Sequence, residues 1–129
     1  MLVIIRGLPG SGKTTLARMF EAQGYTRVEK DMMRTNAAGE YKYNAADNPN
    51  LEEQCAYRTW ANLFMGRDVV VSNCNETLHA VQRYIEIATD LGVPWTVIET
   101  KGNFGSRYGT DEEVGRPRRV KAWEHFPVD

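Results

Sequence analysis

Eight residues near the start of the chain constrain its fold more than any other stretch. Residues 7–14 read Gly-Leu-Pro-Gly-Ser-Gly-Lys-Thr, which is the phosphate-binding loop pattern G-x-x-x-x-G-K-[ST]. Its three glycines permit backbone angles at which successive N–H groups turn inward and bind an anion. Lys13 offers a charge to the β- and γ-phosphates, and Thr14 offers Mg²⁺ a hydroxyl ligand. The expected nucleotide-binding residues are Gly7, Leu8, Pro9, Gly10, Ser11, Gly12, Lys13, Thr14 and Thr15.

The residues on either side of this loop predict the strand and the helix that it connects. Residues 2–5 form a short apolar run, which is typical of a buried parallel strand. After the loop, Leu16, Met19 and Phe20 recur at i, i+3 and i+4, which marks one face of a helix. We therefore expect the loop at a helix N-terminus, where the partial positive charge favours phosphate.

The rest of the chain alternates predicted strands with predicted helices. Strands are expected over residues 25–29, 68–72 and 95–99, and helices over residues 51–65 and from Asn75 or Thr77 to about 91. In the first of these helices the expected core positions are Ala56, Trp60, Leu63 and Phe64. This alternation predicts a three-layer α/β P-loop fold with a mostly parallel sheet, as one domain over residues 1–129.

Length and composition fit one domain and limit its partners. The chain has 129 residues, of which 42% are hydrophobic, enough for a single core. A net charge of −1 gives no overall sign of nucleic-acid binding, although a local basic patch remains open. No apolar run has the length of a membrane span, and no secretory signal is visible. With Cys55 and Cys74 expected to be reduced thiols, we expect a cytoplasmic protein.

An Asp-x-x-Arg stretch follows the second predicted strand. Its spacing places Asp31 and Arg34 on one face of a helical turn, at the sheet edge where open parallel sheets bind ligands. A carboxylate there can take the proton of an attacking hydroxyl. An arginine there can hold a phosphate through two hydrogen bonds. The alternative is an Asp that caps the helix beside an exposed Arg; next to a phosphate-binding loop we favour the functional interpretation.

Three polar residues, Asn73, Cys74 and Asn75, follow the third predicted strand. Enzymes with this loop often carry an Asp at the first position, which holds Mg²⁺ through water. Asn73 can orient a water but has no charge. One interpretation is that Thr14 and Asp31 bind the metal, with Asn73 as a further candidate that acts through water. The other is that Asn73 serves only in a structural turn. Cys74 is expected to be a packing residue.

A basic, glycine-punctuated segment predicts a lid over residues about 101–115. Mobile arginine-bearing flaps stabilise the charge of the γ-phosphate in phosphoryl transfer. Arg107, between Gly105 and Gly109, is the first candidate for this role. Three later arginines could serve in the lid, contact nucleic acid or lie on a solvated helix face: Arg116, Arg118 and Arg119.

With these features in place, the chain resembles the kinase domain of phage-type polynucleotide 5′-hydroxyl kinases. The stretches GLPGSGKTT, EKDMMR and VVVSNCN are similar to that family's loop, its Asp-x-x-Arg stretch and its third-strand segment. That segment normally ends Asp-Thr-Asn, so Asn73 and Cys74 depart from the family whereas Asn75 agrees. The segment from residue 102 to 114 resembles the family's lid, where Asp111 replaces a usual proline.

The resemblance implies transfer of the γ-phosphate of ATP, with Mg²⁺, to the 5′-hydroxyl of DNA or RNA, and a role in nucleic-acid repair. The implied catalytic residues are Lys13, Asp31 as general base, Arg34 on the acceptor phosphate, and Arg107. A kinase of nucleosides, nucleotides or other small molecules is the alternative. Adenylate-kinase-like enzymes share the Asp-x-x-Arg stretch, but their third strand usually ends Asp-Gly-x-Pro-Arg. A nucleotide-binding module without catalysis is the third hypothesis, and the sequence gives no oligomeric state.

Overall fold

A four-stranded parallel sheet organises the fold, in the strand order β2-β3-β1-β4. The computed structural model describes residues 1–33, 46, 48–73, 75 and 77–102. The elements are β1 (Leu2–Gly7), α1 (Lys13–Ala22), β2 (Thr26–Val28), α2 (Lys30–Met33), α3 (Asn48–Phe64), β3 (Val69–Ser72), α4 (Leu78–Asp90) and β4 (Trp95–Thr100). The predicted α/β fold with a parallel sheet is therefore confirmed.

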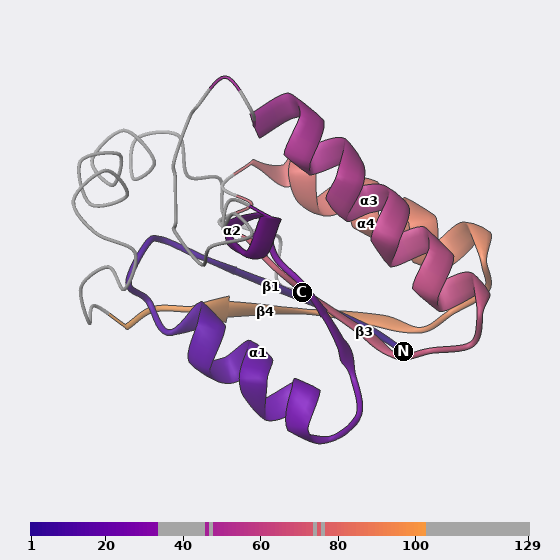
Figure 1. Cartoon of the computed structure of the whole chain (residues 1–129), viewed down its shortest axis with the longest axis horizontal. Helices are drawn as coiled ribbons and strands as arrows, with labels where there is room; N and C mark the ends of the chain where they lie inside the picture. Colours follow the sequence, from indigo (N-terminus) through magenta and orange to yellow (C-terminus); the bar gives the residue numbers. More distant parts are fainter. Residues whose placement is uncertain (34–45, 47, 74, 76, 103–129) are drawn as a thin grey trace.

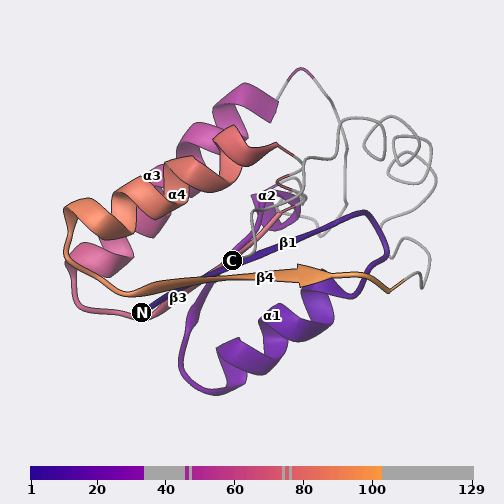
Figure 2. The ribbon, with the colours of Figure 1, turned by 180° about the vertical axis from the view of Figure 1, so that it is seen from behind.

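Helices cover both faces of the sheet. Figures 1 and 2 show α1 on one face and the pair α3 and α4 on the other. The alternation of side chains along β1 serves both layers, because successive strand residues point to opposite faces. Leu2 and Ile4 belong to the core cluster on the α3 and α4 side, whereas Val3 and Ile5 pack with Ala17 of α1. All four of these strand residues are buried, which explains the uninterrupted apolar run.

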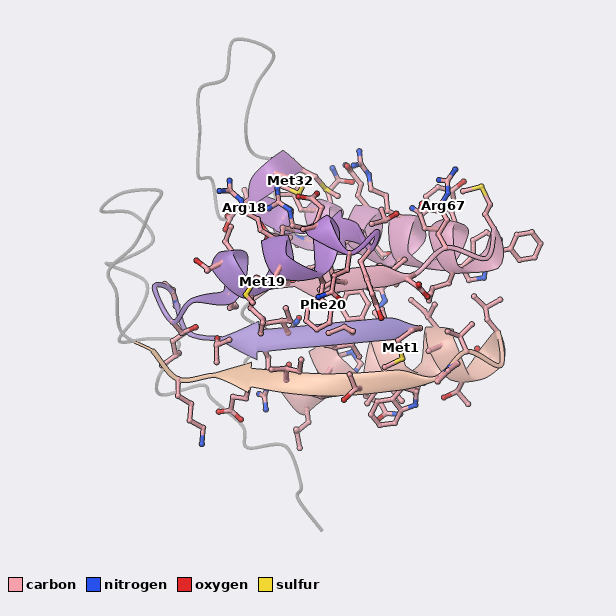
Figure 3. The ribbon with its side chains drawn as sticks, turned by 90° about the horizontal axis from the view of Figure 1, so that it is seen from below. Met1, Arg18, Met19, Phe20, Met32 and Arg67 are labelled. Atoms are coloured by element: carbon pink, nitrogen blue, oxygen red, sulfur yellow. The ribbon has the colours of Figure 1, made fainter. Side chains whose placement is uncertain are left out.

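Two side chains that were expected in the core, Trp60 and Phe64, lie at the surface instead. They are 41% and 67% exposed, and Met19, which the spacing placed on one face of a helix, is 59% exposed. On α1, Phe20 packs against the core cluster while the adjacent Met19 lies exposed. Both side chains are labelled in Figure 3. The prediction was therefore wrong about Trp60 and Phe64, although Leu63 of the same predicted stripe is buried.

Small residues explain how α3 faces the core. Its buried positions are Leu51, Cys55, Ala56, Thr59 and Leu63. Because three of these side chains are small, the helix backbone can approach the sheet and α4 closely. The large aromatics are left outside, where the Trp60 and Phe64 rings stack with centroids 5.1 Å apart. The helix also begins at Asn48, three residues before the predicted start at residue 51.

Candidate functional site

The parallel sheet brings the predicted site residues to one edge. The loop over residues 8–12 follows β1, Asp31 follows β2, Asn73 follows β3, and Thr100 ends β4. Since all strand pairs are parallel, these carboxyl ends lie at the same side of the sheet. Strand β3 separates β1 from β2, so Asn73 lies between the loop and Asp31 in the strand order.

The loop has the backbone of an anion-binding turn. Gly10 and Gly12 have φ angles of 76° and 99°, in the left-handed region that favours glycine. The Ser11 N–H donates to the Leu8 carbonyl at 3.1 Å, which closes a tight turn. The Leu16 N–H donates to the Gly12 carbonyl at 3.1 Å, so α1 begins directly after the loop. This geometry agrees with the predicted phosphate cradle.

Position 7 requires glycine because a Cβ atom does not fit there, and not because of its φ angle. Its φ is not positive, which differs from the expectation that all three glycines serve by backbone freedom. A Cβ at Gly7 would collide with Oγ1 of Thr100 and Oγ of Ser11. These hydroxyls lie 2.6 Å apart, and the Gly102 N–H donates to the Ser11 carbonyl at 3.2 Å. The end of β4 is therefore bonded directly to the loop.

The start of α1 offers donors that no side chain caps. The N-cap is Gly12, which has no side chain to accept from the first N–H groups, and the first turn contains no acidic residue. Lys13 Nζ donates to the Leu8 carbonyl at 3.0 Å, so the ammonium lies over the loop. Thr14 is half-buried and Thr15 is exposed in the first helical turn. A phosphate can thus meet both the helix N-terminus and an ammonium group here.

Arg6, directly before the loop, was not anticipated from the sequence. Its side chain is fully buried, and Nε donates to the Asn75 carbonyl at 3.1 Å. Asn75 is also buried and has a left-handed φ of 49°. The contact joins the end of β1 to the segment after β3. An arginine within the apolar run of β1 was the available signal, because buried arginine is rare and needs specific partners.

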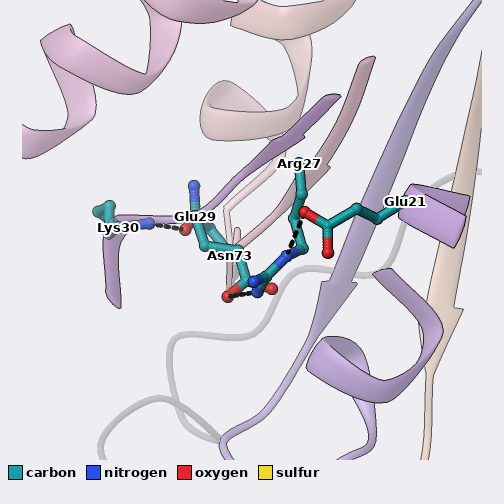
Figure 4. A network of polar contacts seen from close by, with 5 residues as sticks. All are labelled: Glu21, Arg27, Glu29, Lys30 and Asn73. Atoms are coloured by element: carbon teal, nitrogen blue, oxygen red, sulfur yellow. Dashed lines mark hydrogen bonds and ion pairs between the residues drawn. The ribbon is translucent and has the colours of Figure 1, made fainter. Parts of the chain in front are cut away.

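A charged network surrounds the end of β2 (Figure 4). Arg27 donates through Nη1 to Oε2 of Glu29 at 3.1 Å and through Nε to Oε2 of Glu21 on α1 at 3.4 Å. Glu29 is only 2% exposed. Burial raises the pKa of its carboxyl group, the Arg27 guanidinium lowers it, and the nearby negative charge of Asp31 raises it again. Asp31 itself is half-buried in the four-residue helix α2.

Asn73 lies at the junction of several elements. It is 6% exposed, and its Oδ1 accepts the Lys30 backbone N–H at 2.9 Å (Figure 4). Burial raises the pKa of both the Cys55 thiol and the Tyr84 hydroxyl, and hydrogen bonding with the Asn73 side chain opposes both shifts. The amide therefore bonds to α2 and lies near the polar groups of Cys55 on α3 and Tyr84 on α4. Its predicted role toward a metal through water stays a prediction.

The described residues suit a Mg²⁺ ion that is held mainly by its phosphate ligands. Within residues 1–33, 46, 48–73, 75 and 77–102, no group of three or more His, Cys, Asp or Glu side chains could hold a metal. Mg²⁺ in kinases usually takes one or two protein oxygens together with water and phosphate oxygens. Thr14 and Asp31 supply oxygens of the right kind at the correct sheet edge.

Some predicted site residues lie outside the described part of the chain. Arg34, Cys74, Arg107 and the predicted lid beyond Gly102 are not among the described residues. No described helix combines the length and the apolar character that crossing a membrane requires.

Comparison with known proteins identifies a family and a relative that this chain resembles. The family described as AAA domain matches residues 2–101. The bifunctional polynucleotide phosphatase/kinase of Schizosaccharomyces pombe is 26% identical over 125 residues, which cover 96% of this chain and 25% of that protein. The chain thus spans about a quarter of the length of this relative. The resemblance to polynucleotide kinases that the motifs indicated is confirmed as a resemblance.

Solved structures with the same fold belong to several different proteins, as their titles show. A structure of the Pnkp1/Rnl/Hen1 complex matches with a TM-score of 0.65 at 24% identity, over 78% of this chain and 35% of that chain. A gluconokinase from Sinorhizobium meliloti matches with a TM-score of 0.64 at 18% identity, over 95% of this chain and 74% of that chain. The Mycobacterium tuberculosis APS kinase in complex with AMPPNP and APS matches with a TM-score of 0.56 at 18% identity, over 94% of this chain and 70% of that chain. At these identities the likeness shows the fold alone.

Proposed function

We propose that this chain, which belongs to the AAA domain family, is a phosphotransferase that moves the γ-phosphoryl group of ATP to a hydroxyl acceptor. The observation that carries the proposal is the placement of a carboxylate, Asp31, at the same sheet edge as an uncapped phosphate-binding loop. Nucleotide-bound relatives of the same fold, with AMPPNP or ADP-AlF3 in their titles, support ATP as the donor.

The proposed step needs little covalent chemistry from the protein. The acceptor oxygen attacks the γ-phosphorus, and its proton passes to the Asp31 carboxylate. A bond forms between the acceptor oxygen and phosphorus while the bond from phosphorus to the β–γ bridging oxygen breaks, and ADP leaves. Lys13 and the loop amides hold the phosphates and offset charge. Thr14 would hold Mg²⁺, which would supply further charge neutralisation. Arg34 and Arg107 would contact the acceptor phosphate and the transferring group.

The proposed acceptor is the 5′-hydroxyl end of a polynucleotide. The fission yeast relative, whose name includes polynucleotide kinase, aligns along nearly the whole of this chain. Two similar structures, titled as complexes of Pnkp1, Rnl and Hen1, one of them an RNA repair complex, support nucleic-acid ends as the partner. The Asp-x-x-Arg stretch is consistent with this acceptor, because an arginine beside the base can hold a nucleic-acid phosphate.

A small hydroxyl-bearing molecule is the second candidate acceptor. The gluconokinase match has nearly the same TM-score as the Pnkp1/Rnl/Hen1 complex, 0.64 against 0.65. It also covers more of this chain, 95% against 78%. The fold therefore supports either acceptor class, and the motif resemblance favours the polynucleotide.

An acceptor screen with γ-labelled ATP tests the proposal. DNA and RNA oligonucleotides with free 5′-hydroxyls are compared with gluconate, nucleosides and nucleoside monophosphates. We expect label on the oligonucleotides, and its loss in Asp31→Asn with ATP binding retained. Asp90→Asn, an exposed carboxylate on α4, is the matched control and should label normally. Label confined to a small molecule would support the second candidate, and no label with any acceptor would overturn both.

A further inference from the structure

Helix α2, which carries Asp31, is too short to hold its own position. It has four residues, Lys30–Met33, and a helix of this length is unstable alone because nucleation costs more than its few hydrogen bonds return. Its first backbone N–H groups also have no partner within the helix. The orientation of Asp31 therefore depends on contacts from outside α2.

The residue that normally caps such a helix uses its side chain for a different contact here. The residue before α2 normally accepts a hydrogen bond from the first turn through its side chain. Here that residue is Glu29, whose buried carboxylate accepts from Arg27 at 3.1 Å. The Lys30 N–H instead donates to Oδ1 of Asn73 at 2.9 Å, across 43 positions of sequence (Figure 4). Asn73 thus caps α2 from the end of a different strand.

Asn73 is itself firmly held. It follows Ser72, the last residue of β3, which pairs with Ile5 of the central strand β1. The residue is 6% exposed, and its side chain lowers the pKa of the Cys55 thiol on α3 and of the Tyr84 hydroxyl on α4, so it lies beside both helices. A buried side chain that is packed between several elements has little freedom to move. Its hydrogen bond to the Lys30 N–H therefore fixes the first turn of α2 relative to the sheet and to both helices.

We infer that Asn73 is a positioning residue that orients Asp31 by fixing the Lys30 backbone, and that its amide oxygen serves this purpose rather than metal binding. The assignment of Asp31 as the base rests on the proposed function. The link between Asn73 and α2 does not, so the two can fail separately. Two further contacts hold α2: Lys30 Nζ lies 3.4 Å from Oε1 of Glu52, and Met33 packs against the core.

Two substitutions at Asn73 and one at the neighbouring Tyr84 test the inference. Asn73→Ala removes the acceptor, whereas Asn73→Asp keeps an oxygen at the same place. Tyr84→Phe removes only the hydroxyl whose pKa the Asn73 side chain lowers, and leaves the packing of α4 in place. Each variant is measured for hydrogen exchange of the Lys30 amide, with the Val71 amide of β3 as internal reference, and for kcat and KM with ATP and the best acceptor.

We expect the Lys30 amide of Asn73→Ala to exchange about tenfold faster relative to Val71, since it loses its hydrogen bond. The kcat should fall about 10- to 100-fold with KM for ATP within about twofold of wild type, as expected when a reacting group is misplaced. Asn73→Asp should recover most of both properties. Tyr84→Phe should accelerate Lys30 exchange by a smaller factor.

Unchanged exchange of the Lys30 amide in Asn73→Ala would overturn the positioning role. A shift in the Mg²⁺ concentration needed for half activity in Asn73→Ala, without faster exchange, would also overturn it in favour of a metal ligand. Full activity of Asp31→Asn would instead refute the proposed base, and the exchange data would still decide the role of Asn73. If Asn73→Ala does not fold, Asn73→Asp and Tyr84→Phe decide it through the same exchange measurement.

Discussion

Oγ of Ser11 lies 2.6 Å from Oγ1 of Thr100, which bonds the phosphate-binding loop to the end of β4. Thr100 also donates to the Arg6 carbonyl at 3.4 Å, and Ser11 is buried. The loop is thus held from the side by a neighbouring strand as well as by its own turn. A cradle that is held before the nucleotide arrives loses less conformational freedom on binding.

A double-mutant cycle measures this bond. Ser11→Ala and Thr100→Val each remove one hydroxyl, and Val keeps the shape of Thr. We expect each single variant to lose about 1 kcal/mol of unfolding free energy and the pair to show coupling of about 1 kcal/mol, measured by urea denaturation. Thr96→Val on the same strand is the control and should change stability little. Strictly additive single effects would mean that the two hydroxyls do not interact.

Gly7→Ala should damage the loop by crowding it. The new Cβ would strike the hydroxyls of Thr100 and Ser11, so either β4 or the loop must move. We expect a loss of about 1–3 kcal/mol of stability, as for overpacked cores, with weaker ATP binding in calorimetry. Removing one obstacle in Gly7→Ala with Thr100→Ala should restore part of both. Wild-type behaviour of Gly7→Ala alone would contradict the close approach seen here.

Lys13→Ala should separate nucleotide binding from stability. Among the described residues Lys13 makes one hydrogen bond, to the Leu8 carbonyl, so the unfolding free energy should change by less than about 1 kcal/mol. ATP affinity should fall roughly 10- to 100-fold, because charge-assisted bonds to phosphate contribute about 1.5–3 kcal/mol. Arg18→Ala, an exposed cation on the same helix, provides the comparison by isothermal calorimetry. Equal losses in the two variants would argue for a general charge effect.

Buried Glu29 should make the protein less stable as pH rises. Burial raises its folded pKa above the ordinary value of 4.5. The folded state then binds more protons than the unfolded state, so the stability present below pH 4.5 is lost as pH rises through the folded pKa. In Glu29→Gln this loss should disappear, which urea denaturation at a series of pH values between about 4 and 8 can measure.

Glu53 supplies a control of opposite sign. Arg83 hydrogen bonds to this exposed carboxylate at 2.8 Å and lowers its pKa. Its contribution is therefore present above pH 4.5 and is lost as pH falls, and Glu53→Gln should remove a small effect in that direction. If Glu29→Gln and Glu53→Gln alter the pH profile in the same direction, the assignment of Glu29 is wrong.

Adjacent residues on α3 should differ sharply in their contribution to stability. Leu63 is 4% exposed and Phe64 is 67% exposed. We expect Leu63→Ala to cost about 2–5 kcal/mol by leaving a cavity. Phe64→Ala should cost less than about 1.5 kcal/mol, because it loses mainly the stacking on Trp60. Thermal or chemical denaturation of the two variants decides this, and a reversed order would place the aromatic face in the core after all.

Local sequence patterns were sufficient to predict those features of the fold that depend on residues close together in the sequence. The apolar run of β1, the glycine-rich loop and the alternation of strands and helices each express short-range rules, and the structure confirms the fold that they predicted. The stripe on α3 was ambiguous for a physical reason. The spacing of Trp60 and Phe64 is helical, but so is that of Cys55, Thr59 and Leu63, and periodicity alone does not choose between adjacent faces.

Long-range contacts could not be predicted from the sequence pattern. The bond between Asn73 and Lys30 spans 43 positions, and that between Ser11 and Thr100 spans 89. Both exist only because the strand order places the ends of β3 and β4 beside β2 and β1. The sequence indicated that Asn73 was near the site but not which group its amide would meet. Likewise, nothing in the order of residues shows that Glu29 is buried beside Arg27.

The position of β1 between β3 and β4 has a consequence for biosynthesis. Its last-synthesised hydrogen-bonding neighbour is β4 (Trp95–Thr100), so the central strand remains open at one edge until that segment has left the ribosome. During that interval the nascent chain presents an apolar segment, Leu-Val-Ile-Ile, whose unpaired edge invites association with other chains. Translation speed and chaperone supply should therefore influence the yield of soluble protein more than they would for a fold built from successive hairpins.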